Sequence, residues 1–194
     1  MGGALLDAGC GRTAPSLATY RGIAGRLIGV DLVDFTVPNT DMELHQADLA
    51  SMPIESGSVD VMMARSVMEH VERPLETFRE TARVLKPGGH FIFLTANAWD
   101  YASIIAMIVP NRWHPSVVRK VEGRDESDVF PTRYRTNTHS AIRRFSRQSG
   151  FAVRQLDYLG QSPCYFMFNG ALFLAATAYE KLIERFDALA FLRG

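Results

Sequence analysis

Residues 4–13 read ALLDAGCGRT, and this stretch decides how the chain folds. The apolar run at 4–6 predicts a short parallel strand that is buried on both faces. Gly9 and Gly11 lack a Cβ atom, so the backbone can turn sharply there and approach a ligand closely. A carboxylate, Asp7, stands just before the turn. The stretch therefore predicts the floor of a site for a nucleotide-like molecule.

The glycine spacing alone leaves two classes of ligand open. Gly9-x-Gly11-x-x-Ala14 also satisfies the dinucleotide fingerprint, in which a helix N-terminus receives a pyrophosphate. Asp7 favours the other class, because a fixed carboxylate repels a pyrophosphate and attracts a positive group such as a sulfonium or an α-ammonium. A nicotinamide dehydrogenase is therefore the weaker alternative.

Composition sets the broad class. The 194 residues are 47% apolar and 22% charged, which is typical of one globular domain. The formal net charge is zero, so no global field attracts nucleic acid or an anionic membrane. The two cysteines, Cys10 and Cys164, fit no metal-binding spacing and favour a reduced, cytoplasmic setting. We expect no metal site and, ahead of the first strand, no signal peptide.

Residues 4–13 resemble the first motif of the class I S-adenosylmethionine-dependent methyltransferases, Asp-x-Gly-x-Gly-x-Gly, with Thr13 in place of the third glycine. The resemblance extends to about residue 97 and is closest to the type 11 methyltransferases. It implies an α/β fold with a doubly wound, mostly parallel, Rossmann-like sheet, and S-adenosylmethionine as the cofactor. Strands are expected at 4–6, 26–30, 42–46, 59–64 and 90–95, and candidate ligand residues stand at the ends of the first four.

The ends of the first, second, third and fourth strands supply the predicted cofactor site. Asp31 follows Asp7 by 24 residues, close to the offset of roughly 20 at which an acidic residue binds ribose hydroxyls. The resemblance implies that Asp48 and Leu49 hold adenine and that Arg65 and Ser66 face the methionine part. The predicted cofactor-binding residues are Asp7, Ala8, Gly9, Cys10, Gly11, Asp31, Leu32, Ala47, Asp48, Leu49, Arg65 and Ser66.

We expect one structural domain with four parts. Residues 1–97 form the cofactor-binding core, and 98–138 form a lid or substrate insertion. Residues 139–160 complete the same sheet, with a helix at 140–149 and a sixth strand at 151–158, and 161–194 hold an apolar C-terminal helix. The early first strand predicts either an unusually open cofactor site, without the family's N-terminal helices, or an incomplete chain. The family's last, antiparallel strand is not found.

Methyl transfer needs the acceptor, the methyl group and the leaving sulfur in line, and a base where the acceptor is a hydroxyl. His70 and His114 are the candidate bases; a packing or surface role is the alternative for each. The candidate substrate-binding residues are Trp113, Arg133, Tyr134 and Arg135. Arginines such as these can hold a phosphate or carboxylate, and solvated surface arginines are the alternative.

Three functions remain open. The first is methyl transfer, chiefly to oxygen, on a small-molecule, sugar or lipid-linked acceptor; residues 128–137 resemble methyltransferases of glycan or cell-envelope assembly. The second, an RNA or protein methyltransferase, is disfavoured by the zero net charge and by Arg65-Ser66-Val67-Met68 where an Asn/Asp-Pro-Pro-Tyr/Phe segment is expected. The third is a non-catalytic cofactor- or partner-binding module.

The uncharged stretch 159–179 predicts a helix that packs on the domain, on a second copy as a homodimer, or peripherally on a membrane.

Overall fold

The computed structural model describes residues 2–36, 41–101, 103–104, 130–159 and 169–193. The chain divides into two compact units, which we describe separately. The first combines Met1–Thr95 with Arg133–Val153, and the second combines Ala96–Thr132 with Arg154–Gly194. All the candidate cofactor-binding residues lie in the first unit.

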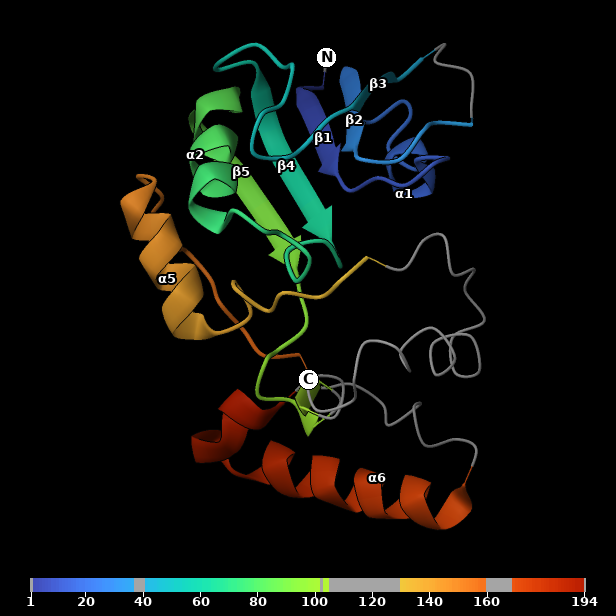
Figure 1. Ribbon diagram of the computed structural model, residues 1–194, viewed down its shortest axis with the longest axis vertical. Helices are drawn as coiled ribbons and strands as arrows, with labels where there is room; N and C mark the ends of the chain where they lie inside the picture. The colour runs from blue at the N-terminus through green and yellow to red at the C-terminus, as the bar shows by residue number, and fades with distance from the viewer. Residues whose placement is uncertain (1, 37–40, 102, 105–129, 160–168, 194) are drawn as a thin grey trace. The chain divides into compact units, whose positions relative to one another are not determined.

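A parallel sheet forms the centre of the first unit (Figure 1). Its five strands are β1 (Ala4–Ala8), β2 (Arg26–Asp31), β3 (Glu43–Gln46), β4 (Val59–Arg65) and β5 (Leu85–Leu94). They lie in the order β3-β2-β1-β4-β5, and each neighbouring pair is parallel. The strand order reverses at β1, and ligands of such sheets bind at the carboxyl ends of the strands at this reversal. The predicted parallel fold is confirmed.

Apolar side chains cover both faces of the sheet, because successive residues of a strand point to opposite sides. Along β1, Leu6 belongs to the core cluster that contains Phe78, whereas Leu5 belongs to the cluster that contains Leu17. Phe78 comes from α2 (Pro74–Val84), and Leu17 comes from the short helix α1 (Pro15–Ala18). The sheet is therefore doubly wound, as predicted.

The turn-forming residues Lys86-Pro87-Gly88-Gly89 lie within β5. Leu85 already pairs with Val59, and the next paired residue, His90, lies opposite Val61. The ladder therefore shifts register between these pairs, and Gly88 adopts a φ of 82° there. Because Leu85 pairs with Val59, α2 ends at Val84 and the chain enters the sheet directly.

Helix α5 (His139–Gln148) follows the expected sequence signals. The Thr138 side chain accepts a hydrogen bond from the Ala141 amide at 3.2 Å, which caps the helix N-terminus. Phe145 lies on Phe78 of α2, with ring centroids 5.9 Å apart, and Gly150 ends the helix with a φ of 82°. The α5 prediction is confirmed within one residue.

The sixth strand predicted at 151–158 is wrong. Residues 151–159 carry neither helix nor strand, although their burial partly alternates. The two compact units also divide between Val153 and Arg154, so the segment does not run as one element along the sheet. Alternating apolar residues indicate a half-buried segment, but a strand also needs a neighbouring edge for its backbone hydrogen bonds.

The second unit contains α6 (Gly170–Arg185) and a 3₁₀ helix, η4 (Asp187–Leu192). The Asn169 side chain caps α6 by accepting from the Ala171 and Leu172 amides, both at 3.1 Å. Asn97 donates to the carbonyls of Phe191 and Arg193. Among the helices described here, none is both long and apolar enough to span a bilayer. The helix predicted at 161–194 begins outside the described residues.

Candidate functional site

The turn after β1 consists of two glycines with different surroundings. Both Gly9 and Gly11 have a φ of 73°, a left-handed conformation that favours glycine. The Gly9 amide donates to the Val30 carbonyl at 2.7 Å, and a Cβ atom on Gly9 would lie 2.1 Å from Cγ2 of Val67. A Cβ atom on Gly11 would meet nothing within 4 Å. The turn therefore packs against Val67 at Gly9, and it faces open space at Gly11.

Asp31 at the tip of β2 holds this turn. Its Oδ2 accepts from the Gly11 amide at 2.7 Å, and its Oδ1 accepts from the Val33 amide at 3.2 Å. A carboxylate oxygen can accept more than one hydrogen bond, so both oxygens keep capacity for a ligand. The neighbouring Leu32 side chain is 56% exposed and adds an apolar surface at the same strand tip.

Asp7 on β1 is a buried carboxylate, only 4% exposed. Burial raises its pKa to about 6, Arg65 opposes the rise, and Asp31 adds to it. In the described part of the chain we find no hydrogen-bond donor to this carboxylate. A buried anion without a donor is costly, so the site favours a ligand that brings positive charge.

Cys10 lies in the same turn but is not suited to act as a nucleophile. Burial, with a further contribution from Asp7, raises the pKa of its thiol to about 12. A Cβ atom on Gly29 would lie 2.8 Å from the sulfur, so the thiol packs closely against β2. Cys10 therefore remains a neutral packing residue, because the thiolate is the reactive form.

The tip of β3 is joined to the tip of β2. The Ala47 amide donates to the Asp31 carbonyl at 2.8 Å. The Asp48 carboxylate accepts from the Ala50 amide at 2.8 Å and from Arg73 at 2.7 Å. Burial raises the Asp48 pKa, but these two donors outweigh it, so the net pKa is lowered. Asp48 is therefore an anion beside the buried Leu49.

The chain leaves β4 through an unusual backbone conformation. Ser66 has a φ of 54°, which is uncommon for any residue except glycine, and its amide donates to the Leu94 carbonyl at 3.0 Å. Arg65, the last residue of β4, donates to Oγ of Ser16 at 2.6 Å. Both residues therefore have fixed positions beside the first-strand turn. The predicted residues of β1, β2, β3 and β4 come together at one edge of the sheet.

A segment far along the chain, residues 133–138, lies against the turn that follows β4; we call it the strap. The Arg133 and Tyr134 amides donate to the Glu69 carbonyl at 2.7 and 3.1 Å. The Arg133 side chain pairs with Glu72 at 3.4 Å, and the Arg135 side chain donates to the Glu72 carbonyl. These candidate substrate-binding residues therefore hold the strap in place, and their role toward a substrate stays a prediction.

Buried side chains complete the attachment of the strap, and no sequence pattern indicated their role. Thr136, fully buried, donates to the Met68 carbonyl at 2.7 Å. Asn137 donates to Thr95 at 2.8 Å, and Thr95 donates to Glu69 at 2.8 Å. Such a network fixes the loop after β4, because each buried polar group needs its partner.

The candidate bases have different outcomes. His70 is half-buried in the turn after β4, and its amide donates to the Val67 carbonyl at 2.9 Å. It is therefore close in sequence to Arg65 and Ser66, and its role as a base stays a prediction. His114 and Trp113 lie outside the described residues. The described residues contain no group of three or more potential metal ligands.

Comparison with known proteins finds similarity to methyltransferases. Residues 6–93 match the profile of a family described as "Methyltransferase domain". A "Probable S-adenosylmethionine-dependent methyltransferase" of Mycolicibacterium smegmatis is 33% identical over 98 residues, which are 48% of this chain and 38% of that protein. A ubiquinone biosynthesis O-methyltransferase of Ruegeria pomeroyi is 33% identical over 123 residues, which are 57% of this chain and 49% of that protein.

A solved structure agrees with the fold. The S-adenosylmethionine-dependent methyltransferase from Mesorhizobium loti superposes with a TM-score of 0.60 and 20% identity, covering 90% of this chain and 86% of that one. At this identity the likeness shows the fold alone. The chain spans less than half the length of the two curated relatives it matches here.

Proposed function

Since residues 6–93 of this chain match the methyltransferase-domain family, and one relative is named as S-adenosylmethionine-dependent, we propose that the protein binds S-adenosylmethionine at the strand tips and transfers its methyl group. The observation that carries this proposal is the buried Asp7 carboxylate, without a donor among the described residues, beside the open space over Gly11. A sulfonium compound with an α-ammonium group brings further positive charge to this carboxylate.

The charges at the β1 and β4 tips fit the amino-acid end of this cofactor. Asp7 pairs with Met63 across the sheet, so Arg65 stands two residues further along the neighbouring strand. The amino-acid end carries one ammonium and one carboxylate. We assign Asp7 to the ammonium and Arg65 to the carboxylate, since a guanidinium donates well to carboxylate oxygens.

The ribose and adenine are assigned to the tips of β2 and β3. The remaining acceptor capacity of Asp31 suits two vicinal hydroxyls, as in related nucleotide-binding sheets. The exposed Leu32 offers an apolar surface to the ring, and Asp48, next to the buried Leu49, offers an acceptor to its amino group. This assignment uses every strand tip that the sequence singled out, and each residue remains individually testable.

The chemistry needs alignment more than a special nucleophile. When bound, S-adenosylmethionine supplies an electrophilic methyl group. The protein holds its acceptor in line through the loop after β4, which the strap keeps in one conformation. We assign to His70 the removal of the acceptor's hydroxyl proton, because imidazole is the most frequent general base in enzymes.

The acceptor we propose is a hydroxyl group on a small, sugar or lipid-linked molecule. One supporting observation is the relative of Ruegeria pomeroyi, named as an O-methyltransferase. Another is the zero net charge, which does not favour RNA. An assay of the methylated product tests this choice of acceptor directly.

Two measurements test the proposal. Calorimetry with S-adenosylhomocysteine should show binding that Asp7→Asn weakens, with Asp34→Asn, at an exposed aspartate after β2, as the control. Methyl-labelled S-adenosylmethionine, incubated with the protein and with cell-envelope, RNA and protein fractions, should label the small or lipid-linked molecules. His70→Gln should lower the rate of labelling without changing cofactor affinity.

Each other outcome has a distinct meaning. Cofactor binding without methyl transfer would indicate a non-catalytic module, and labelled RNA or protein would replace the proposed acceptor class. Absence of binding would contradict the cofactor site.

A further inference from the structure

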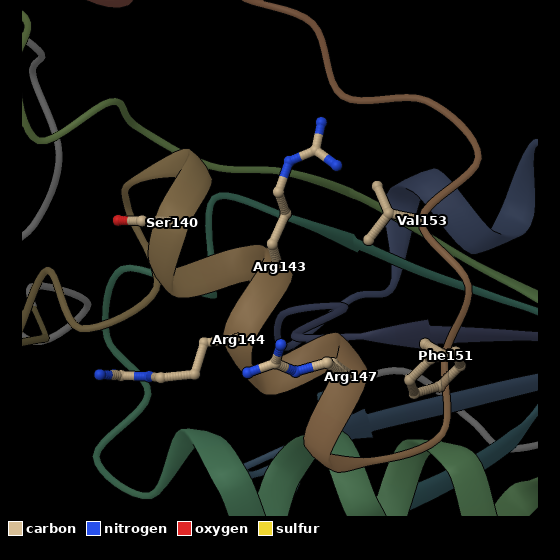
Figure 2. Close-up of a pocket in the computed structure, with 6 residues that line it drawn as sticks. All are labelled: Ser140, Arg143, Arg144, Arg147, Phe151 and Val153. Atoms are coloured by element: carbon tan, nitrogen blue, oxygen red, sulfur yellow. The ribbon is translucent and has the colours of Figure 1, made fainter.

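A groove of about 410 Å³ runs along α5 in the first unit, and the cofactor-binding assignments do not use it. Its lining, drawn in Figure 2, consists of Ser140, Arg143, Arg144, Arg147, Phe151 and Val153. The volume lies within the ~300–1,000 Å³ usual for small-molecule sites. The groove is therefore large enough for a ligand with more than one functional group.

One face of α5 supplies the polar side of this groove. Ser140, Arg143 and Arg147 follow one another at intervals of three and four residues, and Arg144 lies four after Ser140. Residues at such intervals are neighbours on a helix surface. Figure 2 shows the three guanidinium groups fanned out from this helix, with Phe151 and Val153 on the segment that follows it.

The groove arginines differ from other arginines of the same unit in their partners. Arg26 pairs with Glu43 at 2.6 Å, and Arg83 pairs with Glu80 at 2.8 Å. By contrast, the Arg143 and Arg147 side chains have no hydrogen bond or ion pair within the described ranges. The Arg144 guanidinium carbon lies 4.5 Å from the centroid of the Phe145 ring.

Helix stability alone does not account for this grouping. α5 has the sequence HSAIRRFSRQ and contains no acidic residue, so its like charges at intervals of three and four repel one another. The C-terminal end of a helix favours a cation, which explains Arg147 in the last turn but not Arg143 or Arg144. A bound anion would remove the repulsion of all three.

We propose that this groove binds a ligand that carries a phosphate or diphosphate group. Guanidinium groups donate hydrogen bonds in a planar fork that matches phosphate oxygens, and the Ser140 hydroxyl adds a further donor. Phe151 and Val153 form an apolar wall for the carbon skeleton attached to the phosphate. A 10-residue helix presents too short a basic track for an extended nucleic acid.

The groove begins near the rim of the sheet. Ser140 lies two residues after the Thr138 cap, and the strap that precedes it is anchored on Glu69 and Met68. The identification of the ligand as the methyl acceptor rests on the proposed function. The binding of phosphate in this groove does not rest on it, and it is measured without S-adenosylmethionine.

The test uses the full chain and inorganic diphosphate as the probe. We expect calorimetry to show salt-sensitive binding that the double variant Arg143→Gln/Arg147→Gln weakens at least tenfold. Arg143→Lys/Arg147→Lys should retain part of the affinity, because it keeps the charge and loses the fork. Arg79→Gln, at an exposed arginine on α2, is the matched control and should bind as the parent does. Unfolding temperatures and S-adenosylhomocysteine affinity, equal in all variants, establish that the fold is intact.

Two further arms identify the source of the phosphate. If the ligand is a lipid headgroup, the protein should bind vesicles of phosphatidic acid in phosphatidylcholine but not vesicles of phosphatidylcholine alone. Diphosphate should then displace the protein from the vesicles. Diphosphate binding without vesicle binding would indicate a soluble phosphate compound. Diphosphate affinity unchanged in the Gln double variant, no diphosphate binding, or binding only of an RNA oligonucleotide would overturn the inference. Loss of methyl transfer with diphosphate binding intact would count against the proposed function alone.

Discussion

The glycine turn after β1 and the strap at 133–138 both lie at the carboxyl ends of the sheet, but different interactions hold them. The turn depends on backbone conformations at Gly9 and Gly11 and on one nearby carboxylate, Asp31. The strap depends on buried side chains such as Thr136, which bonds a carbonyl 68 residues away. In the proposed site the turn would position the cofactor, and the strap would position the acceptor through side-chain contacts.

The largest effect should come from the turn itself. Gly9→Ala combines a left-handed φ with a Cβ atom 2.1 Å from Val67, whereas Gly11→Ala has the same φ and open space. We expect Gly9→Ala to lower the free energy of unfolding by about 2–5 kcal/mol, from backbone strain and overpacking together. Gly11→Ala should cost about 1–2 kcal/mol.

Urea denaturation of both variants measures this difference. Equal losses of unfolding free energy in the two variants would mean that the Val67 side chain moves aside at little cost and that the turn is not tightly packed. In that case the turn would be no more rigid than the strap.

The second effect concerns ligand affinity at the turn. Asp31→Ala removes the acceptor of the Gly11 amide and the proposed acceptor of the ribose hydroxyls. Hydrogen bonds to a charged group are worth about 1.5–3 kcal/mol, so S-adenosylhomocysteine should bind roughly 10–150-fold more weakly. Asp34→Ala, an exposed aspartate on the same loop, is the control and should bind normally. Similar affinities of the two variants in calorimetry would remove Asp31 from the site.

The strap should respond more moderately. Thr136→Val keeps the side-chain volume but leaves the buried Met68 carbonyl without its donor, which costs about 1–3 kcal/mol. Thr132→Val makes the same chemical change at a half-buried position and should cost less than 0.5 kcal/mol. Amide hydrogen exchange should show faster exchange at residues 133–137 and an unchanged rate at Gly9. Faster exchange in the turn as well would mean that the two regions are one cooperative structure.

The same contrast explains what could be predicted from the sequence. The turn, the strand-tip carboxylates and α5 were predicted because their signals lie within short stretches of chain. The strap attachment was not, since no local pattern indicates that Thr136 meets Met68 or that Asn137 meets Thr95. The left-handed conformation of Ser66 also has no sequence signal, because serine adopts it only where the surroundings require it.

The errors have a similar cause. Residues 151–158 alternate as a strand does, but a pattern within one segment does not show whether a sheet edge is available to it. For the α5 arginines, the sequence shows the positive charges but not which of them lack a carboxylate partner. Those facts depend on contacts between distant segments.

The most direct test of the account is the pH dependence of S-adenosylhomocysteine affinity in the parent protein and in Asp7→Asn. The Asp7 pKa is about 6 in the free protein, and a bound cation should lower it, so binding at pH 5 must first release a proton. We predict that the parent's affinity rises roughly tenfold from pH 5 to 7 and then levels off, as expected for one group with that pKa. Asp7→Asn should bind more weakly at pH 7 and show no such rise. Parallel pH profiles for the two proteins would contradict the claim that the first-strand carboxylate holds the ammonium group of the ligand.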